Sequence, residues 1–83
     1  MINKRKPDKE DFKKYKAGVR MYGSWTLFET IEEAADWCLD GVQSCEGAER
    51  DRFTDAYLAF REGWNYVNTD TPTATYSHKG GEI

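Results

Sequence analysis

Apolar residues in the middle of the chain recur at helical spacing and predict two amphipathic helices. Between residues 31 and 45 they return every three or four positions, which places them on one helix face. Thr30, followed three residues later by Glu33, fits a capping box that satisfies backbone donors at a helix N-terminus. A second stripe with the same spacing runs from Phe53 to Trp64. Two such helices joined by a short loop predict an antiparallel helical hairpin.

The residues before this hairpin predict a short helix and two strands. The helical pattern runs from Pro7 to Gly18, with Gly18 as its left-handed end. Residues 19–22 and 25–28 are rich in β-branched and aromatic side chains, and the pair Gly23-Ser24 between them suits a type II′ turn. The sequence therefore predicts an α+β domain: an N-terminal helix, an antiparallel β-hairpin and a two-helix antiparallel hairpin packed on the sheet.

Length and composition set the limits of this domain. A chain of 83 residues, 39% hydrophobic and 33% charged, forms one small core. We expect a flexible basic arm at residues 1–7, a single domain at 8–77 and a flexible tail at 78–83, with residues 74–76 as a candidate third strand. No apolar run reaches the roughly 20 residues that cross a bilayer, and no secretion signal follows the basic N-terminus, so we expect a cytoplasmic protein.

The net charge of −3 conceals a strong asymmetry. Residues 1–20 hold eight Lys and Arg against three Asp and Glu, whereas residues 21–83 hold four against twelve. A basic segment of charge +5 thus precedes an acidic segment of charge −8. Such an asymmetry is typical of a protein with a charged partner, and a solvated surface explains it equally well.

Chemistry-bearing residues are sparse, and the sequence predicts no enzyme, no cofactor and no metal site. His78 is the only histidine and lies in the Thr-rich tail, where nothing would hold it against a nucleophile. Structural zinc needs four Cys or His ligands, and the chain has three. Cys38 and Cys45 lie two helical turns apart, roughly 10 Å along the axis, which is too far for a disulfide. We expect two small buried thiols in the apolar stripe.

The acidic side chains of the two long helices form the candidate binding surface. Trp37 and Leu58 fall among these acids and resemble hydrophobic anchors inside a charged rim. A solvated acidic face is the alternative for the acids, and packing over Gly41 and against the N-terminal helix is the alternative for Trp37. The candidate partner-binding residues are Glu33, Asp36, Trp37, Asp40, Asp51, Asp55, Leu58 and Glu62.

The basic N-terminal segment supports a second hypothesis. Phe12 and Tyr15 lie among its cations and could stack on nucleic-acid bases, although a core-facing position explains both better and the acidic segment would repel phosphates. The cations are Lys4, Arg5, Lys6, Lys9, Lys13, Lys14, Lys16 and Arg20. A homo-oligomer in which basic segments contact neighbouring acidic bodies is a third possibility.

The second long helix ends in Ala-Phe-Arg-Glu-Gly-Trp-Asn, at residues 59–65. This segment resembles the helix end of a family of small acidic anti-CRISPR proteins from prophages, which inhibit type II Cas9 by occupying the site of the protospacer-adjacent DNA. The order of an N-terminal helix, strands and then helices is also similar. The chain departs from the family after this segment, because Asp70 is the single acid of residues 66–72. No inhibitory residue is therefore carried over.

Together these observations predict a non-enzymatic inhibitor, an anti-CRISPR or similar counter-defence protein of phage or mobile-element origin. It would act in a bacterial host cell and use its acidic helical surface to occupy a basic nucleic-acid-binding site on a host protein, such as a CRISPR effector. The alternative is a nucleic-acid-binding accessory protein of a mobile element that uses the basic N-terminal segment.

Overall fold

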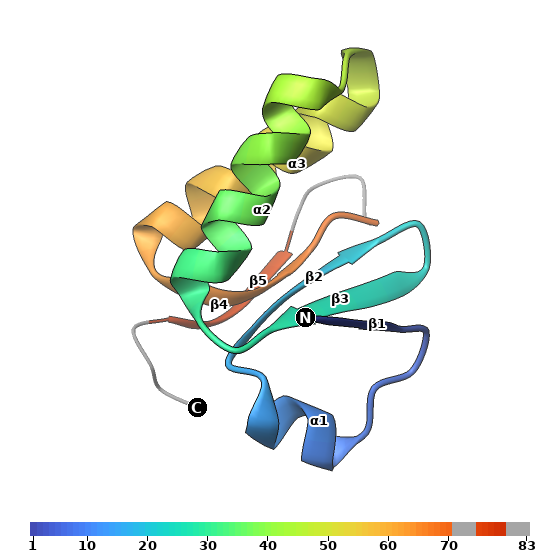
Figure 1. Cartoon of the computed structure of the whole chain (residues 1–83), viewed down its shortest axis with the longest axis vertical. Helices are drawn as coiled ribbons and strands as arrows, with labels where there is room; N and C mark the ends of the chain where they lie inside the picture. The colour runs from blue at the N-terminus through green and yellow to red at the C-terminus, as the bar shows by residue number, and fades with distance from the viewer. Residues whose placement is uncertain (71–74, 80–83) are drawn as a thin grey trace.

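A computed structural model describes residues 1–70 and 75–79 of the chain (Figure 1). Helices and strands form two layers, with a five-stranded sheet beneath a pair of long helices. The elements follow in the order β1 (Ile2–Lys4), α1 (Lys9–Lys14), β2 (Ala17–Met21), β3 (Ser24–Phe28), α2 (Ile31–Ser44), α3 (Gly47–Glu62), β4 (Trp64–Asn68) and β5 (Thr75–Lys79).

The sheet is mixed, with strand order β1-β3-β2-β4-β5. β2 and β4 pair in parallel in its centre, with Val19 opposite Val67, and the remaining neighbours pair antiparallel. The parallel pair requires a crossover connection, which β3, α2 and α3 supply. The α+β class and the helical hairpin on the sheet are thereby confirmed.

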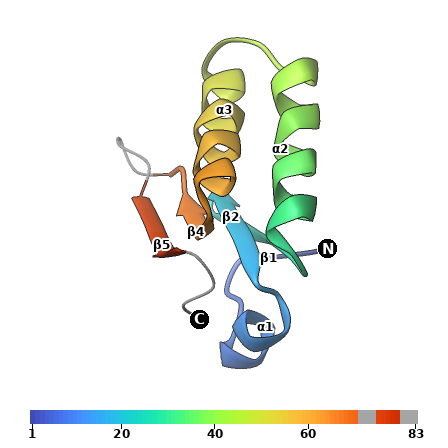
Figure 2. The ribbon, with the colours of Figure 1, turned by 90° about the vertical axis from the view of Figure 1, so that its left-hand side faces the viewer.

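The main core lies between the sheet and the pair α2 and α3. Val19 and Val67 from the central strands are fully buried there, and Phe28 and Phe60 are each 2% exposed. Figure 2 shows α2 and α3 side by side on one side of the sheet and α1 on the other. In the same view the connected ends of α2 and α3 extend well past the sheet. The last turns of α2 and the first turns of α3 therefore have no strand beneath them.

A second, smaller core covers the opposite face of the sheet. Phe12 from α1, Trp25 from β3 and Tyr66 from β4 meet edge to face, with ring centroids 5.3 to 6.3 Å apart. Edge-to-face contacts stabilise aromatic pairs in addition to the stabilisation that comes from their buried area. Tyr15 and Leu27 are buried beside them. Phe12 and Tyr15 thus occupy the core-facing position that was one of their two predicted roles.

The structure corrects the expected positions of two glycines. α1 ends at Lys14, and Gly18 lies inside β2, where an added Cβ would collide with Leu27. A glycine that permits close packing has the same local sequence signature as one that ends a helix. The hairpin turn is also one residue earlier than expected: Tyr22 and Gly23 both have positive φ, of 53° and 77°, which defines a type I′ turn.

Two segments form strands where none was expected. Ile2–Lys4 pair with β3 as strand β1, so this part of the predicted flexible arm is wrong. Trp64–Asn68 form β4, although Trp64 was assigned to the helix stripe. The candidate third strand falls in β5, which includes residues 75 and 76 and also the first two residues of the expected tail. Residues 74 and 80–83 of these predictions lie outside the described residues.

Candidate functional site

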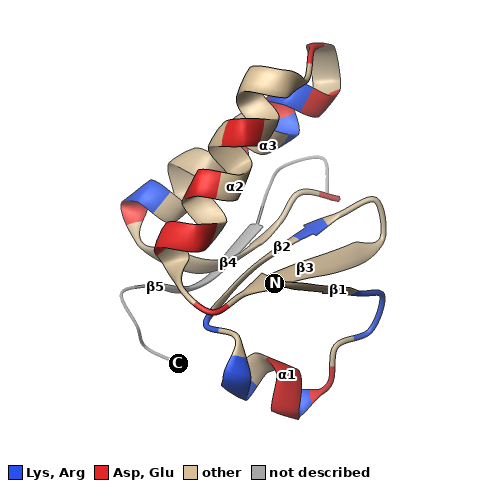
Figure 3. Cartoon of the chain, viewed as in Figure 1, with Lys and Arg blue, Asp and Glu red and all other residues tan. Residues whose placement is uncertain are grey.

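The acidic side chains of α2 lie in a row on its outer side. Glu33, Asp36 and Asp40 are exposed, and the residues between them, including Ala34 and Cys38, are buried against the core. Figure 3 shows the acidic positions of α2 along the side that faces the viewer, with α3 behind the helix. α2 contains no Lys or Arg. The negative charge of this row is therefore not balanced on its own helix.

α3 carries the second acidic row. Asp51, Asp55 and Glu62 are exposed on the side of the helix that faces away from the buried Ala56. Leu58 lies among them and is 55% exposed, which makes it one of the large hydrophobic side chains left in solvent. The six predicted carboxylates form no ion pair with one another or with any other side chain described within residues 1–70. The two rows follow the outer sides of two helices, so they form two strips rather than one patch.

Trp37 is half-buried and packs inward. Its ring lies 5.5 Å from that of Phe28 and 5.2 Å from that of Phe53, in tilted contacts. The expected packing over Gly41 is consistent with this position, but the N-terminal helix is not involved, because α1 lies on the opposite face of the sheet. Trp37 is thus a core residue with one exposed side, a combination that a helical pattern alone does not reveal.

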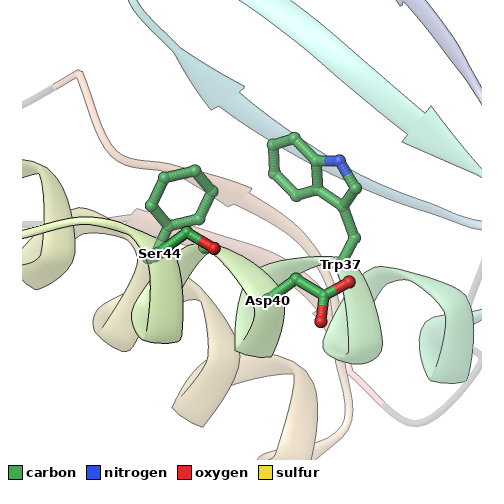
Figure 4. A pocket seen from close by; sticks show the side chains of 5 residues that line it. Trp37, Asp40 and Ser44 are labelled. Atoms are coloured by element: carbon green, nitrogen blue, oxygen red, sulfur yellow. The ribbon is translucent and has the colours of Figure 1, made fainter.

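A groove opens beside Trp37, between α2 and α3. Its volume is about 250 Å³, and Trp37, Asp40, Gly41 and Ser44 from α2 line it together with Phe53 from α3. Figure 4 shows Trp37, Asp40 and Ser44 on successive turns of α2. Gly41 has no side chain, and the ring of Phe53 fills the space that a Cβ there would occupy. The groove is therefore apolar at its base and acidic at its rim.

Sequence reasoning missed a charged cluster around Asp70. The carboxylate of Asp70 accepts hydrogen bonds from the backbone N–H groups of Tyr22 and Gly23, at 2.7 and 2.8 Å. It also pairs with Arg20 at 3.2 Å and with Arg52 at 3.3 Å. These groups are separated by up to 50 positions along the chain, so no sequence pattern connects them. The cluster fixes the β2–β3 turn to the end of β4, which gives Asp70 a structural role.

The basic segment is largely part of the fold. Lys4 in β1 donates a hydrogen bond to Asp11 in α1, at 3.0 Å. This contact raises the pKa of Lys4 and lowers that of Asp11, because each charge stabilises the other. Most of the other cations of residues 1–20 are exposed, whereas the rings of Phe12 and Tyr15 are engaged in the smaller core.

Both cysteines are free thiols, and Cys38 is buried as the sequence predicts, whereas Cys45 at the end of α2 is only partly buried. Burial raises the pKa of Cys38 to about 12, and burial together with the carboxylate of Glu49 raises that of Cys45. Raised values disfavour the thiolate, which is the nucleophilic form. In the described part of the chain, no three His, Cys, Asp or Glu side chains gather as a metal site would need. The side chains of Ser77 and His78 lie outside what the structure describes.

Comparisons with protein-family models, curated proteins and solved structures found no match. The fold and the charged surface describe this chain as a small α+β protein with an acidic helical hairpin on a mixed sheet. The segment that carries the anti-CRISPR resemblance has a structural explanation of its own: Gly63 ends α3 with φ of 100°, and Trp64 begins β4. No helix among the described residues is both long and apolar enough to span a membrane.

Proposed function

We propose that this protein is a non-enzymatic binding protein that presents the acidic strips of α2 and α3 to a basic nucleic-acid-binding site on another protein. The observation that carries the proposal is the set of six exposed carboxylates without ion pairs to described side chains. Because no described cation of the chain pairs with these carboxylates, they can attract the Lys and Arg side chains of a partner that otherwise contact phosphate.

The distribution of the remaining charge supports this choice. Residues 29–62 comprise the two long helices, the two residues before them and the short loop between them, and they hold ten acids and three arginines. One of these arginines, Arg52, is already paired with Asp70, outside the acidic strips. The cations of residues 1–20 belong mainly to the edge strand β1, to α1 on the opposite face of the sheet, and to the segments around them. A basic partner that approaches α2 and α3 therefore meets a surface with a large excess of negative charge, which increases the association rate.

An anti-CRISPR or similar counter-defence role in the cytoplasm of a bacterial host is the specific form of this proposal. The resemblance at residues 59–65 supports it, together with the small size and acidic helical surface of the chain. In this role the protein would occupy the DNA-binding site of a type II CRISPR effector and would be inhibitory without any chemical step.

The test is competition between this protein and DNA for a purified type II effector loaded with guide RNA. We expect the wild-type protein to displace a fluorescent duplex that contains the protospacer-adjacent motif. A variant with Asp36, Asp40, Asp51 and Asp55 changed to Lys should not displace it. The matched control changes Arg5, Lys6, Lys9 and Lys16 to Glu, on the other side of the sheet, and should compete as the wild type does. Circular dichroism confirms that all variants are folded.

Two outcomes would contradict different parts of the proposal. If the wild-type protein leaves the duplex bound, the CRISPR effector is not the partner. Affinity capture from a bacterial lysate, followed by competition with DNA for each captured protein, then tests the general form. Equal competition by the acid-reversed variant and the wild type would show that the acidic strips are not the binding surface.

A further inference from the structure

The groove beside Trp37 has the composition of a receptor for one cationic side chain. Pockets that bury a drug-sized ligand measure roughly 300–1,000 Å³, and this groove of about 250 Å³ is smaller. It is also open to solvent rather than enclosed. A single long side chain from a partner fits such a space better than a free cofactor does.

The walls of the groove are apolar and held in place. The indole of Trp37 is fixed by contacts with the rings of Phe28 and Phe53, so its exposed side is presented in one orientation. Phe53 is 8% exposed and packs against the bare backbone of Gly41. These surfaces suit the methylene groups of a long side chain, because methylene groups form no hydrogen bonds with water and can be buried without losing any.

The rim of the groove is anionic. Asp40 is exposed and makes no ion pair with any described side chain. Glu33 and Asp36 belong to the same row on α2 and add to the negative field. The hydroxyl of Ser44, one turn beyond Asp40, supplies a neutral acceptor at the other end of the rim. An occupant with a positive head group is therefore favoured over a neutral or acidic one.

We propose that this groove binds an arginine side chain of the basic partner, with the guanidinium over the Trp37 ring and paired with Asp40. Arginine fits better than lysine because its planar head group both stacks on an aromatic face and forms two parallel hydrogen bonds to a carboxylate. This inference rests on the proposed function, since it names the chemistry of the partner, and it makes Trp37 and Asp40 the centre of the interface.

The groove is tested without any partner protein, by titration with Nα-acetyl-arginine N-methylamide monitored by ¹H–¹⁵N NMR. We expect saturable shifts of the Trp37 indole N–H and the Gly41 amide. The indole signals of Trp25 and Trp64 should not move, since neither residue lines the groove. The lysine analogue should bind more weakly, and the citrulline analogue, which keeps the shape without the charge, should produce no saturable shift.

Two substitutions on α2 isolate the role of Asp40. Asp40→Asn removes the charge at the rim, and we expect the dissociation constant of the arginine analogue to rise about fivefold, as for a partly exposed ion pair. Glu32→Gln removes one exposed carboxylate from the same helix outside the groove and should leave the constant unchanged. Equal shifts with citrulline, or unchanged affinity in Asp40→Asn, would overturn the inference. Either result would leave the competition experiment with the effector and its acid-reversed variant unaffected.

Discussion

The two faces of the sheet are built by different means. On one face two helices of 14 and 16 residues bury a core of Ala, Val, Phe and Cys side chains. On the other face a helix of six residues, none of them buried, covers a cluster centred on Tyr15, Leu27 and Tyr66. The first face is stabilised by area, and the second by a few aromatic contacts together with the hydroxyl of Tyr66.

The charges follow the same division. The acids of α2 and α3 lie on the outer sides of the helical layer, and most of the N-terminal cations lie around β1 and α1. The sequence suggested a basic arm in front of an acidic body, but β1 and α1 are parts of the sheet and of its second core. The asymmetry is therefore a difference between two sides of one domain. A partner selected by charge meets either the helical layer or the face that α1 covers.

The largest expected effect concerns how firmly the helical layer is closed, which the reactivity of Cys38 reports. Cys38 is fully buried, and burial raises its pKa to about 12, so the folded state disfavours both access of a reagent and formation of the thiolate. In a Cys45→Ser background we expect a disulfide reagent to label Cys38 correspondingly slowly in the folded state and rapidly in urea. Cys45 in a Cys38→Ala variant is partly exposed and should react faster. Similar labelling rates for the folded Cys45→Ser and Cys38→Ala variants would show that the helical layer opens readily.

The two cores should also differ in what they lose when an aromatic ring is removed. Phe60 is 2% exposed, and we expect Phe60→Ala to lower the free energy of unfolding by about 3–5 kcal/mol. Phe12 is half-buried in the smaller core, and Phe12→Ala should cost about 2 kcal/mol, roughly half of the usual loss. Urea denaturation followed by Trp fluorescence measures both. A larger loss for Phe12→Ala would invert the ranking of the two cores.

The helical layer was the part that the sequence predicted well, because its signals are local. Thr30 caps α2 by accepting a hydrogen bond from the N–H of Glu33, at 3.2 Å, and Gly63 ends α3. The exposure of Glu33 and Asp36 follows from the same helical periodicity. Trp37 lies between the apolar stripe and the outer side of α2. Whether its ring packs inward depends on how far the sheet extends beneath α2, and helical periodicity carries no information about that distance.

The sheet was predicted less well, because its pairing is set by contacts distant in sequence. β4 is an interior strand because it pairs in parallel with β2, 48 residues earlier, where Gly18 is opposite Tyr66. The alternation of Trp64, Tyr66 and their neighbours after Gly63 was an available strand signal that the helix stripe concealed. The ion pairs of Asp70 join three separate segments, and no local rule predicts them.

A smaller effect should separate the aromatic area of the second core from its hydrogen bonds. The hydroxyl of Tyr66 lies 2.8 Å from the carbonyl oxygen of Tyr15 and 3.2 Å from that of Phe12, to which it can donate. Tyr66→Phe keeps the ring and should lower the free energy of unfolding by about 1 kcal/mol. Combined with Phe60→Ala, the losses should add, since the residues belong to separate cores. A strong departure from additivity would mean that the two faces act as one core.

The smallest expected effect tests whether the basic segment is held to the fold by its charge. Lys4→Gln removes the contact with Asp11 between β1 and α1, and Lys6→Gln, outside the described ion pairs, is the control.

The pH dependence follows from the two pKa shifts. Because the pKa of Asp11 is lowered, its contribution to stability is complete above pH 3.8 and is lost as the pH falls further. The raised pKa of Lys4 makes its contribution present below 10.5 and lost at higher pH. The difference between wild type and Lys4→Gln in thermal denaturation should therefore be greatest near neutral pH, smaller than that of Tyr66→Phe, and absent in strong acid. A difference that persists in strong acid would mean that packing of the Lys4 stem, rather than the ion pair, holds β1 to α1.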